Sequence, residues 1–77
     1  MALFDVLDEL VYLGNMITVE SYSREVYRIT LGQGGEYIIE SCGLIFRSKE
    51  EVIELCGEVL RISLFDFDTE EETVVCW

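Results

Sequence analysis

The chain has 77 residues and a formal net charge of −11, from 16 Asp and Glu against five Lys and Arg, yet 51% of its residues are hydrophobic and its mean hydropathy is +0.30. This apolar share excludes a disordered acidic chain, because such a composition can build a core that offsets the entropy of ordering. No stretch approaches the roughly 18 consecutive apolar residues of a transmembrane helix. Repulsion by phosphates also argues against direct binding to nucleic acid or to an anionic membrane.

The length predicts a single domain covering residues 1–77, because a folded chain of this size buries only about 60% of its unfolded surface and cannot fill two cores. The amino terminus lacks a basic region and carries Asp5, which argues against a signal peptide. Cys42, Cys56 and Cys76 are odd in number and form no CxxC motif, and the chain has no histidine. We therefore expect neither a zinc site nor a disulfide framework, but free thiols in a reducing cytoplasm.

The first element that the sequence predicts is a helix from Leu3 to Leu13. Apolar residues recur there at helical spacing, with polar residues on the opposite side. The apolar positions are Leu3, Leu7, Leu10 and Val11, and the opposite side carries Asp5, Asp8, Glu9 and Tyr12. Gly14 and Asn15 end the helix, since both residue types adopt the left-handed backbone conformation readily.

Three strands are expected next, because apolar and polar residues alternate with a period of two. They cover residues 17–22, 27–31 and 37–39. Polar residues at 21–25 predict the first turn, and the run Gly32-Gln33-Gly34-Gly35 predicts the second. The pattern therefore indicates a three-stranded antiparallel meander.

A second helix is predicted to begin at Ser48. The segment Ser48-Lys49-Glu50-Glu51 has the Ser-x-x-Glu pattern of a capping box, in which the serine and glutamate side chains accept hydrogen bonds from backbone N–H groups that the helix leaves unpaired. The apolar face continues through Val52, Leu55, Cys56, Val59 and Leu60. Gly57 is placed inside this helix, at a cost of about 1 kcal/mol relative to alanine.

The remainder of the chain leaves two alternatives open. Residues 62–67 form either a fourth strand, which we prefer, or the helix end and a loop whose aromatic side chains fold back on the core. After the acidic segment 68–72, the β-prone residues 73–77 either pair at a sheet edge or remain frayed. The predicted fold is α+β: an N-terminal helix, a three-stranded antiparallel meander and a second helix, with a short fourth strand as the open alternative (αβββα or αβββαβ).

No catalytic or metal-binding motif is present. Without histidine, GxSxG or a metal-type Cys cluster the usual nucleophile and base pairs cannot be assembled, so we expect no enzyme activity and no cofactor. Residues 66–70 alternate oxygen ligands as a calcium loop does, but Glu71 stands where that loop needs glycine and Trp77 where it needs a bidentate acid. The glycines at 32–35 lack the Gly-Lys-Ser/Thr of a phosphate loop.

The acidic surface itself is the candidate site. Three groups of carboxylates are predicted to bind a protein: Asp5, Asp8 and Glu9 in the first helix; Glu50, Glu54 and Glu58 in the second; and Asp66, Asp68, Glu70, Glu71 and Glu72 near the carboxyl end. In the second group, intervals of four residues place the carboxylates about 6 Å apart along the helix axis. Like charges at this spacing destabilise a helix by about 0.2–0.5 kcal/mol per pair, so the row does not serve to form the helix. One such group alone is typical of an ordinary solvated face, but three groups together with only five Lys and Arg favour a binding role.

Three segments show a further pattern: Asp5-Val6-Leu7-Asp8-Glu9-Leu10, Tyr27-Arg28-Ile29-Thr30-Leu31 and Glu36-Tyr37-Ile38-Ile39-Glu40. In this order, in a short acidic chain, they resemble small phage anti-CRISPR proteins, the type II inhibitors that act as DNA mimics at the PAM-reading site of Cas9. The resemblance implies an inhibitor whose carboxylates occupy the basic nucleic-acid-binding cleft of a target such as a CRISPR effector, with association accelerated by charge. Those inhibitors carry a further helix where this chain has a short acidic segment, so no contact residue is transferred.

A second hypothesis is a small acidic adaptor or oligomerising subunit. It pairs through Trp77, Phe65, Phe67 or an open strand edge, either as a homodimer or by adding a strand to a partner. Salt distinguishes the two hypotheses, because a charge-steered complex weakens steeply with ionic strength whereas apolar pairing does not.

Overall fold

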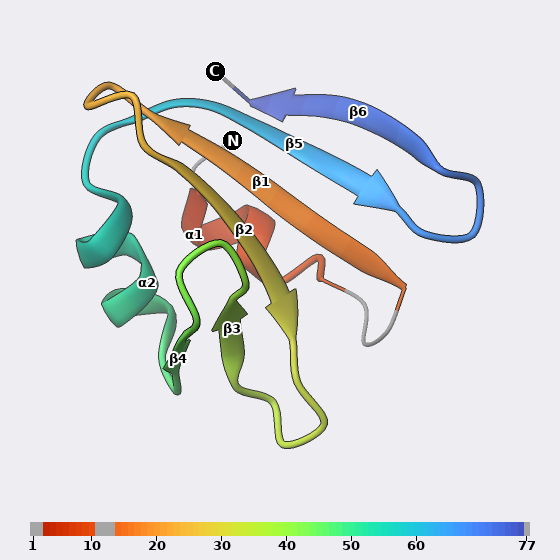
Figure 1. The fold of residues 1–77 in the computed structure, drawn as a ribbon, viewed down its shortest axis with the longest axis horizontal. Helices are drawn as coiled ribbons and strands as arrows, with labels where there is room; N and C mark the ends of the chain where they lie inside the picture. Colours follow the sequence, from red (N-terminus) through yellow and green to blue (C-terminus); the bar gives the residue numbers. More distant parts are fainter. Residues whose placement is uncertain (1–2, 11–13, 77) are drawn as a thin grey trace.

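Within residues 3–10 and 14–76, which the computed structural model describes, six antiparallel strands and two short helices make up the fold (Figure 1). The helices are α1 (Leu3–Leu7) and α2 (Lys49–Cys56). The strands are β1 (Asn15–Ser21), β2 (Val26–Leu31), β3 (Tyr37–Ile39), β4 (Leu44–Phe46), β5 (Val59–Asp66) and β6 (Glu71–Cys76).

The strands form one sheet in the order β4-β3-β2-β1-β5-β6, with β1 near its centre. β1 to β4 make a meander, α2 then carries the chain to the other side of β1, and β5 pairs there before β6 completes a hairpin. Two predicted turns are confirmed: Ser21 N–H donates to Glu25 O at 2.9 Å, and Gly32 N–H donates to Glu36 O at 2.8 Å. β1 therefore joins both halves of the sheet.

The predicted three-stranded αβββα arrangement is wrong, because the sheet has six strands. Three residues of β4 are too few to show an alternating pattern, and the first residues of β5 continue the helical spacing of α2. The strand preferred for residues 62–67 is present over 62–66 as part of β5. Residues 73–76 belong to the edge strand β6, so the edge-pairing alternative is confirmed for them, while position 77 lies outside the described residues.

The helix α2 begins as predicted but ends earlier. Ser48 Oγ accepts a hydrogen bond from Glu51 N–H at 3.3 Å, and the Glu51 carboxylate accepts one from Arg47 N–H, also at 3.3 Å. The helix stops at Gly57, which has a φ of 67° and whose N–H donates to Ile53 O at 2.9 Å. The prediction that Gly57 lies inside a longer helix is therefore wrong.

The helix α1 covers only the beginning of the segment predicted to be helical up to Leu13. A turn follows it, in which Asp8 N–H donates to Asp5 O at 3.2 Å. Residues 11–13 of that prediction lie outside the described residues. The turn keeps Asp5 and Asp8 close together although the helix is short.

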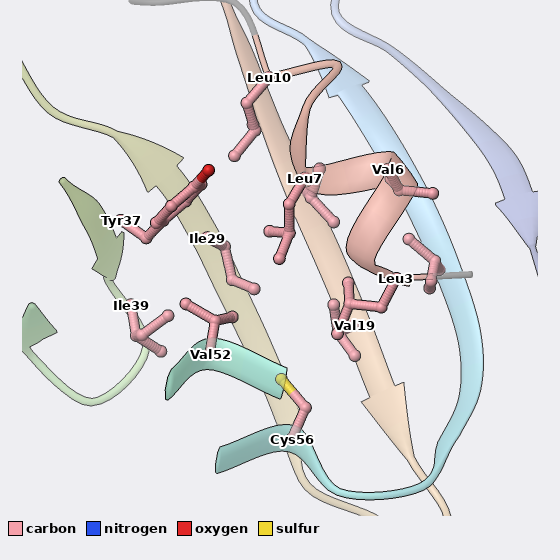
Figure 2. Packing of buried hydrophobic residues seen from close by; sticks show 12 residues of the cluster. Leu3, Val6, Leu7, Leu10, Val19, Ile29, Tyr37, Ile39, Val52 and Cys56 are labelled. Atoms are coloured by element: carbon pink, nitrogen blue, oxygen red, sulfur yellow. The ribbon is translucent and has the colours of Figure 1, made fainter. Parts of the chain in front are cut away.

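Both helices pack on the same face of the sheet (Figure 2). Their apolar side chains converge on β1, β2 and β3 and form one buried cluster with them. The most buried strand residues of this cluster, each at most 1% exposed, are Ile17, Val19, Ile29, Ile39 and Ile62. Burying one such side chain stabilises the fold by about 1.5–3 kcal/mol. We call the opposite face of the sheet, which no described helix covers, the open face.

Candidate protein-binding surfaces

The first predicted carboxylate group lies on α1 and the turn after it, beside α2. Asp8 forms an ion pair with Lys49 of α2, and the Lys49 ammonium lies 4.4 Å from the centroid of the Phe4 ring. The hydrogen bond to Asp8 raises the pKa of Lys49. Asp5 and Glu9 are exposed, and no described cation lies within ion-pair distance of either. Asp8 is thus partly neutralised, while its two neighbours remain available to a partner.

The second predicted group does not form the expected row. Glu50 and Glu54 are exposed on α2, but Glu58 lies beyond Gly57, in the connection to β5. There the Glu58 carbonyl accepts a hydrogen bond from Tyr22 N–H at 3.0 Å. The prediction of three carboxylates at regular helical spacing is wrong, because the helix ends before the third. Glu50 also lies in the first turn of α2, where the helix dipole favours a negative charge.

The third predicted group includes carboxylates that hold the β5–β6 hairpin together. Asp66 Oδ1 accepts a hydrogen bond from Asp68 N–H at 2.8 Å, which fixes the start of the turn. The carboxylate of Glu72 accepts one from the hydroxyl of Ser63 at 2.7 Å, and Ser63 is only 4% exposed. Asp66 and Glu72 therefore have structural roles that the sequence pattern did not predict.

The exposed carboxylates of the three predicted groups lie mainly in two places. Because α1 and α2 contact each other, the acids of the first group share one layer of helices with Glu50 and Glu54, while Glu58 lies in the connection to β5. Asp68, Glu70 and Glu71 are exposed at the other end of the molecule, in and beside the β5–β6 turn. Figure 1 shows α2 and this turn at opposite ends of the longest dimension, which measures 30 Å. The structure thus brings two predicted groups together and separates the third from them.

The open face carries a line of apolar side chains that the sequence analysis missed. Ile45 of β4 pairs with Ile38 of β3, Ile38 pairs with Thr30 of β2, and Met16 of β1 pairs with Phe65 of β5. Ile45 is 61% exposed, and Ile38, Met16 and Phe65 are partly exposed. We call Ile45, Ile38, Met16 and Phe65 the apolar stripe. Alternation in each strand hints at these residues, but only the pairing of the strands aligns them.

A shallow hollow of about 480 Å³ opens beside the apolar stripe. Ile38 and Phe67 contribute apolar walls, and Glu36 and Glu40 contribute carboxylates. The Thr30 hydroxyl donates a hydrogen bond to Glu40 Oε1 at 3.4 Å. Among the described residues, no Lys or Arg lines the hollow. Its chemistry therefore suits a cation that carries an alkyl stem.

Other kinds of site find little support. Within residues 3–10 and 14–76, no group of three or more Cys, Asp or Glu side chains is arranged to hold a metal ion. Cys42 is exposed and Cys56 is buried, and both are free thiols. Burial raises the pKa of Cys56 to about 11, which keeps this thiol protonated and unreactive near neutral pH. None of the described helices is long and apolar enough to cross a membrane.

Comparisons with known proteins give no independent guide to function. No protein-family model, curated protein or solved structure matches the chain. We therefore base the function on the charge distribution and the geometry of the sheet.

Proposed function

We propose that the chain is a protein-binding inhibitor whose carboxylates approach and block the basic nucleic-acid-binding surface of another protein. The supporting observation is an excess of exposed carboxylates that no described cation neutralises. Among the described residues, the ion pairs are Asp8 with Lys49 and Glu20 with Arg61. The exposed acids of the predicted groups that lack such a pair are Asp5, Glu9, Glu50, Glu54, Glu58, Asp68, Glu70, Glu71 and Glu72.

This crowding of charge works against folding, because like charges repel each other over a domain that measures only 30 × 25 × 21 Å. The Debye length at physiological ionic strength is about 8 Å, so neighbouring carboxylates act together on an approaching partner. A cleft lined with Arg and Lys relieves the repulsion and is reached faster because of the attraction. The carboxylates imitate a track of phosphates, of which a DNA duplex presents one per about 1.7 Å of its axis.

A CRISPR effector of the Cas9 type is one target with this chemistry, because arginines read its PAM guanines. The support for that target is the acidic surface alone, since the six-stranded sheet differs from the three-stranded arrangement that carried the resemblance. Such a target places the protein in the cytoplasm, a compartment in which the free thiols of Cys42 and Cys56 stay reduced.

The proposal is tested by capture followed by competition. The tagged chain is mixed with cell lysate at low salt, the bound proteins are eluted with a salt gradient, and each identified protein is assayed for nucleic-acid binding with and without the chain. We expect a nucleic-acid-binding protein among those eluted by salt, and we expect the chain to displace its nucleic acid. The proposal fails if every captured protein keeps its nucleic acid when the chain is present.

Charge-neutral variants then show whether the predicted groups steer association. Glu50→Gln with Glu54→Gln removes two charges from α2, and Glu70→Gln with Glu71→Gln removes two from the opposite end. We expect each double variant to slow association at low salt by about threefold to tenfold and to leave dissociation nearly unchanged, because these charges act at a distance. Unchanged association in both double variants indicates that the predicted groups are ordinary solvated faces.

The apolar stripe favours a second candidate function, an acidic adaptor that pairs through an apolar surface. Phe65 belongs to the stripe, and its ring centroid lies 5.5 Å from that of Phe67; the sequence predicted both residues as pairing residues. A complex of this kind keeps its affinity at high salt, whereas a charge-steered inhibitor loses affinity. The salt dependence of the captured complex therefore separates the two functions.

A further inference from the structure

We infer that the open face is the docking surface for the partner, and that it receives a protein surface with protruding apolar side chains flanked by Lys or Arg. The inference rests on the proposed function for the partner's positive charge. It goes beyond the proposed function by assigning different roles to two parts of the surface. The carboxylates of the helices and of the β5–β6 turn accelerate association, and the open face supplies the contacts that slow dissociation.

The apolar stripe is the first observation that supports this assignment. Antiparallel sheets commonly leave one face to water, and that face normally carries polar side chains. Here Ile45, Ile38, Met16 and Phe65 run from β4 to β5 on the face that no described helix covers. Phe67 extends the line, packing edge-to-face on Phe65 at an interplanar angle of 69° while remaining 43% exposed. The stripe therefore presents apolar side chains on both sides of Thr30 that a partner can bury.

The open face is broad enough for one partner surface to contact several strands at once. In the view of Figure 1, down the shortest molecular axis, the six strands spread across the molecule. The two longer dimensions of the molecule are 30 and 25 Å, so the projected area of this face is at most roughly 750 Å². A standard protein–protein interface buries about 800 Å² on each partner. A single partner surface can therefore cover the stripe and the hollow together.

The glycine-rich turn between β2 and β3 leaves room for one carboxylate of the hollow. A Cβ added at Gly34 would lie 2.5 Å from Glu36 Oε2, and one added at Gly32 would contact the same carboxylate. The glycines leave the space over the turn to Glu36, whose side chain is half-buried there. The turn thus holds a negative charge at the rim of the hollow.

The hollow supplies the charge complementarity that identifies the occupant. A Lys or Arg side chain can lay its alkyl stem along Ile38 and Phe67 while its head reaches the carboxylates of Glu36 and Glu40. The residues lining the hollow include no Lys or Arg, and no described ion pair involves Glu36 or Glu40. The occupant is therefore a basic side chain of the partner, next to apolar side chains that cover the stripe.

A second copy of the chain is a poorer occupant. Each copy has a net charge of −11, so two copies repel each other. The described cations of the open face are Arg61, which pairs with Glu20 at 3.2 Å, and the exposed Arg28, so a second copy offers few cations to the carboxylates of this face. The face therefore fits a basic partner better than it fits itself.

The test uses two synthetic peptides as probes, equal in length and in number of lysines, one with leucines between the lysines and the other with serines. Each is titrated into the isotope-labelled chain, and binding is followed by NMR shifts of the backbone amides. We expect the leucine peptide to bind at least about tenfold more tightly, because only it buries the apolar stripe. The largest shifts should fall on the strands that carry the apolar stripe and line the hollow, β1 to β5.

Two substitutions on one strand provide matched variants. Ile45→Ser alters the open face, and Leu44→Ser alters the adjacent residue, which points to the other face and is 43% exposed. We expect Ile45→Ser to weaken the leucine peptide about threefold to tenfold through faster dissociation, and Leu44→Ser to leave its affinity unchanged. Circular dichroism confirms that both variants are folded.

Three results overturn the inference. The first is equal affinity of the two peptides, and the second is a set of shifts confined to α1, α2 and the β5–β6 turn. The third is a dimer of the free chain, measured by sedimentation, that Ile45→Ser converts to a monomer, since the occupant is then a second copy. In the first two cases the inhibitor proposal survives if the captured partner still loses its nucleic acid. Failure of the docking inference can therefore be distinguished from failure of the proposed function.

Discussion

Gly57→Ala distinguishes the observed end of α2 from the longer helix that the sequence pattern predicts. Inside a continuous helix, alanine is more favourable than glycine by about 1 kcal/mol. In the structure, Gly57 has a φ of 67° and a ψ of −137°. This conformation costs a residue with a Cβ about 1–3 kcal/mol. The added Cβ meets no atom within 4 Å, so the expected penalty is conformational rather than steric.

We therefore expect Gly57→Ala to lower the free energy of unfolding by about 1–3 kcal/mol. With a urea m-value of about 1 kcal/mol per M for a small domain, the midpoint of unfolding falls by roughly 1–3 M, measured by far-UV circular dichroism. Glu54→Ala is the control, because Glu54 is exposed in the same helix and its replacement should change stability by less than about 0.5 kcal/mol. A gain of about 1 kcal/mol in Gly57→Ala would refute the reasoning, since it would mean that the helix continues and that Glu58 joins Glu50 and Glu54.

Three further predictions concern the core, the hairpin and the buried thiol. Ile29 has 0% exposure, so Ile29→Ala should lower the free energy of unfolding in urea by about 2–5 kcal/mol. Ile45 is 61% exposed, so Ile45→Ala should lower it by less than about 0.5 kcal/mol. Equal losses in the two variants would contradict the assignment of the two faces. Ser63→Ala should cost about 1 kcal/mol through loss of the 2.7 Å hydrogen bond to Glu72, and a double-mutant cycle with Glu72→Gln should show this coupling. Burial raises the pKa of Cys56 from 9.0 to about 11, so the unfolded chain loses this proton at a lower pH than the folded chain does. The contribution of this thiol to the free energy of unfolding is therefore complete below pH 9. Between pH 9 and pH 11 it should fall by about 1.4 kcal/mol per pH unit. Cys56→Ala should remove that part of the alkaline slope, and an unchanged slope excludes the buried thiol as its cause.

Turns and caps could be predicted where one residue type decides the backbone. The Ser48 cap, the polar turn after β1 and the glycine-rich turn after β2 all occur where the sequence places them. The strand count could not be predicted, because β4 has only three residues and β5 begins with Val59 and Leu60, whose spacing continues the apolar face of α2. Gly57 is the residue that separates the two elements. A helix-interior glycine and a helix-ending glycine look identical in the sequence until the backbone angles are known.

In the candidate site, too, the features that depend on neighbouring residues could be predicted, and those that depend on contacts distant in the sequence could not. The sequence correctly indicates a high density of carboxylates, but it cannot tell which of them are used internally. Asp66 closes a turn, Glu72 binds Ser63, and Asp8 pairs with Lys49, and each of these partners is set by the fold. The apolar stripe depends on the register of four strand pairings, so no local pattern could reveal it.

The salt dependence of the complex between the chain and its captured partner tests the central claim most directly. If carboxylates steer the chain to a basic nucleic-acid-binding surface, the association rate falls steeply between low and physiological ionic strength, while dissociation from the open face changes little. The partner's nucleic acid should be released in parallel with complex formation. An association rate that is independent of salt, in a complex that leaves the nucleic acid bound, would contradict the account.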